Sequence, residues 1–167
     1  MNRVLLKFGY HMIADVTIRL AIRADAADIA AMSRDYIEHG LPWRWRHDRV
    51  AAAIANPDTN VAVVGEHGAI VAFGIMSYAD VDAHLLLFAV RSASQRTGVG
   101  SAVLLWLETV ARTAGAKRIL VEARRDNSAA RNFYSERGYH ERTIKTAMYS
   151  GIADGIRLEK LLRIEAA

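Results

Sequence analysis

Cysteine is absent from the 167 residues of this sequence, and proline occurs only twice, as Pro42 and Pro57. Without cysteine the chain has no disulfide bond, no thiolate zinc site and no cysteine nucleophile. This usage fits a protein of the reducing cytoplasm, which is the location that we predict. Neither proline opens a linker, and no repeat or low-complexity segment interrupts the sequence. The length therefore fits a single domain with one sizeable core.

Strong charge and long apolar runs are missing as well. The formal net charge of +4 can help to attract a polyanionic small molecule, but it is too small and dispersed to predict nucleic-acid binding. No apolar run of about 18 residues is present, so we expect no membrane span. The histidines do not follow a metal-ligand spacing, so we expect no bound metal.

Patterns along the chain predict a mixed α/β fold. Residues 1–15 are predicted to be an N-terminal extension that need not be ordered, and residues 16–167 a single domain. The apolar run at 83–90 is continuous, which predicts a strand covered on both faces. Strands are predicted at 16–23, at two places within 60–79, and at 83–90, 118–123, 139–148 and 155–162. Helices are predicted at 25–39, 48–55, 99–114 and 127–138.

The segment QRTGVG, residues 95–100, places two glycines at the start of a predicted helix. Glycine costs about 1 kcal/mol relative to alanine in a helix, so the pair indicates a sharp turn or a close approach to the main chain. The first N–H groups of a helix have no intrahelical partner, and the helix dipole adds positive potential, so this position is a candidate anion site; the alternative is that the glycines only make a turn. A Walker P-loop is excluded because its lysine is missing. The third glycine of a dinucleotide motif is replaced by Val103.

Two sequence blocks resemble the GNAT acetyltransferase superfamily. The segment 95–100 is similar to its Q/R-x-x-G-x-G/A signature, and LLLFAV before it is similar to the family's fourth strand. NSAARNFYSERGYHE, residues 127–141, resembles the second block, N-x-x-A-x-x-F-Y-x-x-x-G-F. The resemblance extends from about residue 16 to 162. It implies a mostly antiparallel central sheet with a parallel central strand pair and flanking helices.

The same resemblance implies that acetyl-CoA is the acetyl donor and that main-chain amides of the loop hold its pyrophosphate. The N–H of Ala89 or Val90 would be the oxyanion donor. Asn127 is predicted to be a helix cap, and in the family this position often also contacts the cofactor, so both roles can hold. Arg131, like Arg124 and Arg125, would either meet the 3′-phosphate of the cofactor or belong to a solvated basic face. The implied cofactor-binding residues are Phe88, Ala89, Val90, Gln95, Arg96, Thr97, Gly98, Val99, Gly100, Ser101, Asn127 and Arg131.

Acetyl transfer to an amine needs a base, an oxyanion donor and an acid for the departing thiolate. Tyr134 matches the family's tyrosine and is the candidate acid; the alternative is that it only packs beside Phe133. His84 lies six residues before Val90, where the histone-type branch carries its glutamate, and is the candidate base. His84 can also be a structural or exposed residue. A water relay through Asp80 or Asp82 is a further alternative, although both residues also suit a polar strand connection.

The acceptor site is predicted around the segment LPWRWRHD. Trp43 and Trp45 would form aromatic walls for a hydrophobic amine, or would instead anchor this loop to the core. Tyr149 is predicted to close the pocket from the late strands. We predict direct transfer of an acetyl group to a primary amine, carried by a small molecule or a peptide, within a ternary complex.

Other classes of function are compatible with the same sequence. A non-catalytic acyl-CoA-binding or sensing module would keep the fold without turnover, and an interaction domain would bind no cofactor. We expect neither a nucleic acid nor a membrane as partner. A second copy of the chain is a candidate partner, because dimers are common in the family that the chain resembles.

Overall fold

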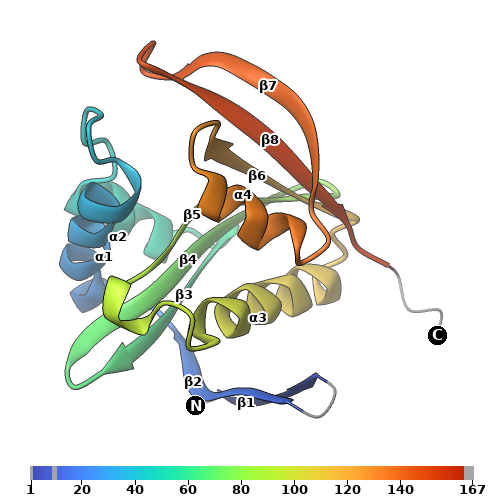
Figure 1. Ribbon diagram of the computed structural model, residues 1–167. Helices are drawn as coiled ribbons and strands as arrows, with labels where there is room; N and C mark the ends of the chain where they lie inside the picture. Colours follow the sequence, from blue (N-terminus) through green and yellow to red (C-terminus); the bar gives the residue numbers. More distant parts are fainter. Residues whose placement is uncertain (1, 9–10, 164–167) are drawn as a thin grey trace.

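The computed structural model describes residues 2–8 and 11–163. Within these ranges one sheet has the strand order β1-β2-β3-β4-β5-β6-β8-β7 (Figure 1). Its neighbouring strands are antiparallel except for β5 and β6, which run parallel. The strands are β1 (Asn2–Phe8), β2 (His11–Leu20), β3 (Thr59–Glu66), β4 (Ala69–Ala79), β5 (Asp82–Val90), β6 (Arg118–Arg124), β7 (His140–Tyr149) and β8 (Ala153–Leu161).

Helices cover both faces of the sheet. They are α1 (Ala26–Met32), α2 (His47–Ala55), α3 (Val99–Thr113) and α4 (Ser128–Ser135). The apolar faces of α1 and α2 pack on one side, where they share a core cluster with Phe73 and Ile75 of β4. Helix α3 packs on the other side, with α4 beside it (Figure 1). The predicted class, a mixed α/β domain with a mostly antiparallel sheet and one parallel pair, is confirmed.

The predicted helix at 25–39 differs from what is observed. Helix α1 ends at Met32, and one π-helical turn, Ser33–Ile37, follows it. In that turn the N–H of Glu38 donates to the carbonyl of Ser33 (2.7 Å), which is a bond over five residues. The buried Glu38 carboxylate then accepts hydrogen bonds from the Ser33 hydroxyl and from the N–H of Arg44. A local hydrogen-bond network therefore replaces the last regular turns of the helix.

The division into an extension at 1–15 and a domain at 16–167 stays a prediction, and parts of both lie outside the described residues. The described parts of residues 2–15 pair as β1 with the first half of β2. None of the described helices is long and apolar enough to cross a membrane.

A bulge in β5 changes the direction of its side chains. Ile75 of β4 pairs with Leu87, and the next residue, Met76, pairs with Leu85, so Leu86 is the extra residue. Ala83 and Leu85 therefore pack in the core on the α3 side, whereas Leu87 and Ala89 pack on the α1 side. A one-residue insertion has this effect because successive side chains alternate between faces.

The prediction that β5 is covered on both faces holds only after the bulge. There, Phe88 packs against the α3-side core while Leu87 and Ala89 are buried on the α1 side. At the bulge, Leu86 is 37% exposed, and His84 before it is only half-buried. The less covered residues are thus His84, which pairs with β6, and Leu86, which lies just beyond that pairing.

The parallel strands β5 and β6 separate after a short pairing. Their register runs from Asp82 opposite Arg118 to Leu85 opposite Val121. Beyond Leu85, β5 keeps its pairing with β4, and β6 keeps its pairing with β8. The gap that opens between the two strands leads to the first turns of α3 and α4.

Candidate active site

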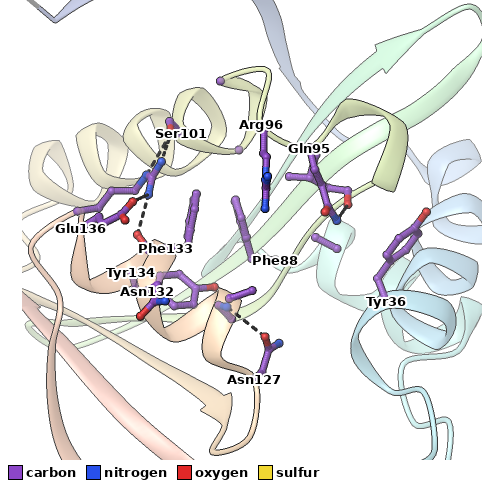
Figure 2. A pocket seen from close by; sticks show the side chains of 17 residues that line it. Tyr36, Phe88, Gln95, Arg96, Ser101, Asn127, Asn132, Phe133, Tyr134 and Glu136 are labelled. Atoms are coloured by element: carbon purple, nitrogen blue, oxygen red, sulfur yellow. Dashed lines mark hydrogen bonds and ion pairs between the residues drawn. The ribbon is translucent and has the colours of Figure 1, made fainter.

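A cavity of about 680 Å³ lies between the end of β5, the start of α3 and helix α4 (Figure 2). Nine of the twelve predicted cofactor-binding residues line it. Three come from β5, five from the loop and first turn of α3, and one from the cap of α4. They are Phe88, Ala89, Val90, Gln95, Arg96, Gly98, Gly100, Ser101 and Asn127.

The loop at 95–100 is held by local contacts. The Gln95 side-chain amide donates to the carbonyl of Val90 (3.0 Å), which attaches the loop to the end of β5. Gly98 precedes α3 with φ +89°, a left-handed conformation that favours glycine. At Gly100 an added Cβ would lie 3.2 Å from the Val90 side chain. The two glycines therefore serve different purposes: one makes the turn, and the other lets α3 approach β5.

Three predicted cofactor-binding residues do not line the cavity. The Thr97 hydroxyl donates to the carbonyl of Ser94, and Val99 is buried in the α3-side core. Arg131 makes a two-point ion pair with Glu141 (2.7 and 3.0 Å) on β7. Its guanidinium is therefore directed to the sheet edge and not toward the cavity.

Asn127 is the cap of α4, as its position in the sequence suggested. Its side-chain oxygen accepts a hydrogen bond from the N–H of Ala130 (3.1 Å). The same residue lines the cavity, so the two interpretations of Asn127 are compatible in this geometry.

Tyr134 lines the cavity from α4 and is also part of an aromatic cluster. Its ring packs edge-on against Phe133 and Tyr139, with centroids 5.4 and 5.5 Å away. Burial raises the pKa of Tyr134, and the nearby Tyr149 adds to this shift. A raised pKa keeps the phenol protonated, which is the form that can donate a proton.

His84 lies on the opposite face of the sheet from Phe88, outside the residues that line the cavity. Its Nε2 contacts a carboxylate oxygen of Glu122 on β6, and its side chain is 33% exposed. The other carboxylate oxygen of Glu122 accepts hydrogen bonds from Nε and Nη2 of Arg157 on β8 (3.0 and 2.7 Å). Three neighbouring strands thus contribute one connected row, His84, Glu122 and Arg157.

Burial raises the pKa of Glu122, but the hydrogen bonds from His84 and Arg157 outweigh that effect and lower it to about 2. A carboxylate with so low a pKa is a weak base. It can nevertheless orient the imidazole and balance a positive charge on it.

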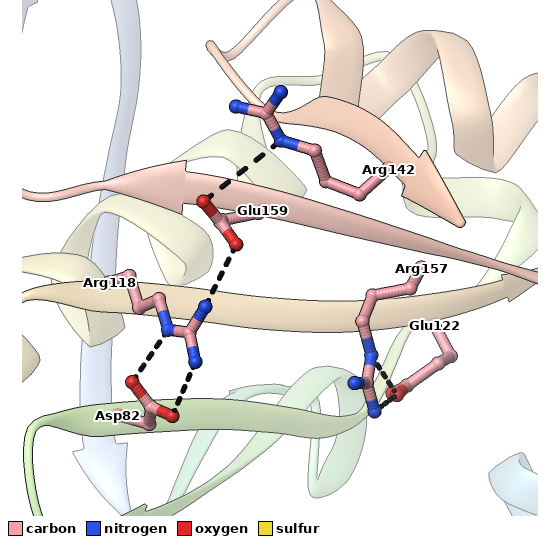
Figure 3. A network of polar contacts seen from close by, with 6 residues as sticks. All are labelled: Asp82, Arg118, Glu122, Arg142, Arg157 and Glu159. Atoms are coloured by element: carbon pink, nitrogen blue, oxygen red, sulfur yellow. Dashed lines mark hydrogen bonds and ion pairs between the residues drawn. The ribbon is translucent and has the colours of Figure 1, made fainter.

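A second polar network connects β5, β6, β8 and β7 at the end where β5 and β6 are still paired (Figure 3). Arg118 donates two hydrogen bonds to Asp82 (2.7 and 3.0 Å) and one to Glu159 (3.1 Å), which also lies 4.0 Å from Arg142. The hydrogen bonds from Arg118 lower the pKa of Asp82. This arrangement suits Asp82 to a structural role, in line with its interpretation as a polar strand connection.

Residues 27–139 match the model of the acetyltransferase (GNAT) family. The chain belongs to this family. The family that the two motifs indicated is therefore confirmed, and its members transfer acetyl groups from acetyl-CoA. No curated protein sequence matches the chain significantly.

Three solved structures show how closely the fold of this chain matches those of known proteins. Ard1 from Thermoplasma volcanium is 23% identical, with a TM-score of 0.78 over 88% of this chain and 97% of its own. The ribosomal-protein-S18-alanine N-acetyltransferase from Escherichia coli is 27% identical, with a TM-score of 0.73 over 90% and 95%. YncA from Salmonella typhimurium, solved with its cofactor acetyl-CoA, is 20% identical, with a TM-score of 0.76 over 92% and 98%.

In this GNAT protein the two tryptophans of the segment 41–48 pack on the core and do not line the cavity. Trp43 and Trp45 lie against the cluster beneath α1 and α2. The Trp43 ring lies between the guanidinium groups of Arg34 and Arg46, with its centroid 5.3 and 4.9 Å away. These contacts favour the anchoring role over a direct wall of the cavity.

The residues just before this segment are attached to the sheet near His84. Arg124 lies two residues after Glu122 on β6, and its Nη2 donates to the carbonyls of Ile37 (2.9 Å) and His39 (2.5 Å). Burial, together with the nearby Glu122 carboxylate, raises the pKa of Tyr149 to about 12. Tyr149 therefore lies near both Glu122 and Tyr134, on the side where we expect the acceptor.

Reasoning from the sequence missed several residues of the site, and three of them bear on its chemistry. Tyr36 lines the cavity from the π-helical turn, and its hydroxyl accepts a hydrogen bond from the N–H of Ser92 (3.2 Å). Arg137 lines it just beyond α4. Glu122 lies in a strand that the sequence predicted, but its contact with His84 depends on the β5–β6 register. Only for Arg137 was there a signal, since it lies inside the second conserved block.

Among the described residues, no group of three or more His, Asp or Glu side chains is arranged to hold a metal ion.

Proposed function

We propose that this GNAT protein transfers the acetyl group of acetyl-CoA to a primary amine by direct attack within a ternary complex. One observation carries the proposal: a single cavity joins the N-terminal end of α3, the end of β5 and the Tyr134 side chain. Acetyl-CoA would supply the acetyl group as an activated thioester. The acceptor is a small molecule or a peptide with a free amine.

The residues present fit this cofactor. A volume of about 680 Å³ lies within the range of about 300–1,000 Å³ that is usual for ligand sites. The first N–H groups of α3 suit a diphosphate because they lack intrahelical partners and lie at the positive end of the dipole. The gap between β5 and β6 leaves the main chain of Ala89 and Val90 within reach of a bound group.

His84 would act as the base on the acceptor side of the sheet. A primary amine is protonated at neutral pH and has no free electron pair, so its proton must first be removed. His84 accepts this proton at its imidazole, directly or through water, and the ionised Glu122 balances the resulting positive charge. The amine nitrogen then forms its bond to the carbonyl carbon.

Tyr134 would act as the acid on the cofactor side. As the carbon–sulfur bond breaks, its hydroxyl donates a proton to the departing sulfur. The main-chain N–H of Ala89 or Val90 donates to the carbonyl oxygen while negative charge develops there. The attacking nitrogen then loses its second proton, which restores the Tyr134 hydroxyl through water, and His84 releases its proton to solvent, so that the neutral amide and the free thiol are the products.

The proposal is tested by calorimetry with coenzyme A and by an assay of thiol release from acetyl-CoA over a panel of amines. Because the Escherichia coli neighbour acts on the alanine of ribosomal protein S18, the panel includes a peptide with a free N-terminal alanine. We expect binding of coenzyme A and turnover with at least one amine. Binding without turnover on any amine would favour an acyl-CoA sensor, and no binding would refute the assignment.

Replacing Glu122 with glutamine is expected to lower kcat/KM about tenfold, which is the usual effect of losing one charge-assisted hydrogen bond. The acidic limb of the pH–rate profile should also move to lower pH, because the amide no longer stabilises the protonated imidazole. The low pKa of Glu122 keeps this carboxylate ionised through the neutral range, so the limb is not its own titration.

The control for this experiment is Glu159→Gln, which removes a carboxylate from the same face of the sheet without a contact to His84. It should leave the acidic limb in place. A limb that does not move in Glu122→Gln would show that Glu122 has a structural role only.

A further inference from the structure

Arg137 forms one end of the cavity, on the side away from Tyr36. Figure 2 shows Tyr36 at one end and Ser101 and Glu136 at the other. The Arg137 guanidinium donates to the Ser101 hydroxyl from Nε (3.1 Å) and from Nη2 (2.5 Å), and to the carbonyl of Phe133 from Nη1 (2.7 Å). It thereby connects the segment after α4 to the first turn of α3.

The plane of this guanidinium is fixed by stacking. Its central carbon lies 3.7 Å from the centroid of the Phe133 ring, and the Phe88 ring stacks on Phe133 with centroids 5.4 Å apart. An arginine held in this way offers a rigid set of N–H donors, which matches the oxygens of a phosphate group. Less side-chain entropy is lost on binding, because the rotamer is already set.

The positive charge of Arg137 is only weakly compensated. Its ion-pair partner in the described part of the chain is Glu136, 3.8 Å from Nη1 and 76% exposed to water. The buried Glu108, which also acts on Arg137, is itself paired with Lys160. Partial burial lowers the pKa of Arg137, which shows that the cation loses hydration in this position. A bound anion would replace the favourable interaction with water that the guanidinium loses on burial.

The order of groups along the cavity indicates which anion this is. In the function proposed above, on which this inference rests, the thioester lies near Tyr134 and the diphosphate lies at the amides that follow Gln95. The nucleotide of coenzyme A continues beyond the diphosphate, away from the thioester. Ser101 follows the last glycine of the loop and Arg137 is hydrogen-bonded to it, so this pair is where we place the next anionic group, the 3′-phosphate.

We propose that Arg137 binds the 3′-phosphate of coenzyme A and selects the complete cofactor over its 3′-dephospho form. Arg131 was one candidate for this role from the sequence, with a solvated basic face as the alternative, and its guanidinium is paired with Glu141. Arg137 is thus a specificity-determining residue of the cofactor site. Its substitution should affect one phosphate of the ligand and leave the remainder of the binding energy intact.

The test is a cycle of two ligands and two proteins, measured as dissociation constants by calorimetry and as KM in turnover. The native protein should bind coenzyme A at least about tenfold more tightly than 3′-dephospho-coenzyme A, since a charge-assisted contact is lost. Arg137→Gln should weaken coenzyme A by a similar factor and change 3′-dephospho-coenzyme A by less than about threefold. The ratio between the two ligands should then approach one.

Two further variants make the result specific. Arg137→Lys keeps the charge but loses the planar fork, so it should retain part of the selectivity and lose it as salt is raised. Arg112→Gln removes the same charge from α3 at a position outside the cavity and should leave the ratio unchanged. Melting temperatures of all the variants report whether the fold is kept, and Arg137→Lys serves if Arg137→Gln does not fold.

Equal weakening of both ligands in Arg137→Gln would overturn the proposal, because the contact would then be to another part of the cofactor or purely structural. A native protein that does not discriminate between the two ligands would overturn it as well. These outcomes differ from failure of the proposed function, in which the native protein binds neither ligand.

Discussion

Replacing His84 with alanine is expected to lower kcat/KM by about 10²- to 10⁴-fold, which is the usual contribution of a general base. The acidic limb of the pH–rate profile should disappear, because the group whose protonation causes it has been removed. The KM for acetyl-CoA should change little, since His84 lies outside the cavity, on the other face of the sheet. The measurement is a pH–rate profile at saturating acetyl-CoA with the best acceptor from the amine panel.

The His84 experiment has an internal control in added imidazole. A small base that enters from solvent should restore part of the activity of His84→Ala, because the side chain is partly exposed. An acidic limb that survives near about pH 6–7 in the variant would assign the base to another group. A water relay through Asp82 is disfavoured as that other group, because Arg118 already donates two hydrogen bonds to the Asp82 carboxylate.

Replacing Tyr134 with phenylalanine is expected to lower turnover by roughly 10²-fold or more, because the departing thiolate loses its proton donor. Burial raises the pKa of Tyr134, so the hydroxyl is protonated at every pH at which the protein is assayed. The loss should therefore be the same from acid to mildly basic pH and should not produce a new limb. Steady-state kinetics across this range, with coenzyme A binding measured in parallel, check the prediction.

Tyr139→Phe is the matched control for Tyr134. Tyr139 belongs to the same aromatic cluster and is also buried, but its hydroxyl donates to Glu108 (3.2 Å) and it does not line the cavity. Its loss should reduce the free energy of unfolding by about 1 kcal/mol and leave turnover unchanged. If the two variants behave alike, Tyr134 is a packing residue and the proton comes from elsewhere.

Several parts of the site could be predicted because their signals are local. The loop 95–100 has glycines at a helix start, and Gly98 does adopt the left-handed conformation that such a turn requires. Asn127 precedes a helix and is its cap. These features depend on a few consecutive residues, and so do the helix and strand periods that led to the correct fold class.

Other parts could not be predicted because they depend on pairing. Arg131 and Arg137 lie in the same conserved block, and only the position of β7 decides that Arg131 meets Glu141 and leaves the cavity to Arg137. The sequence allowed both a binding wall and an anchor for the two tryptophans, and the packing of α1 and α2 favours the anchor. The π-helical turn that brings Tyr36 to the cavity has no clear pattern in the sequence.

The amino-acid sequence alone was sufficient to predict the fold class and the family, which are confirmed, and it also predicts a loop for a diphosphate. Each of these rests on residues that are close together along the chain, where propensity and spacing act directly. The contact of His84 with Glu122, the separation of β5 and β6, and the position of Arg137 at the end of the cavity were decided by the tertiary structure. They arise from the register of strands that are far apart in sequence and from one extra residue at Leu86, which reverses the faces of a strand.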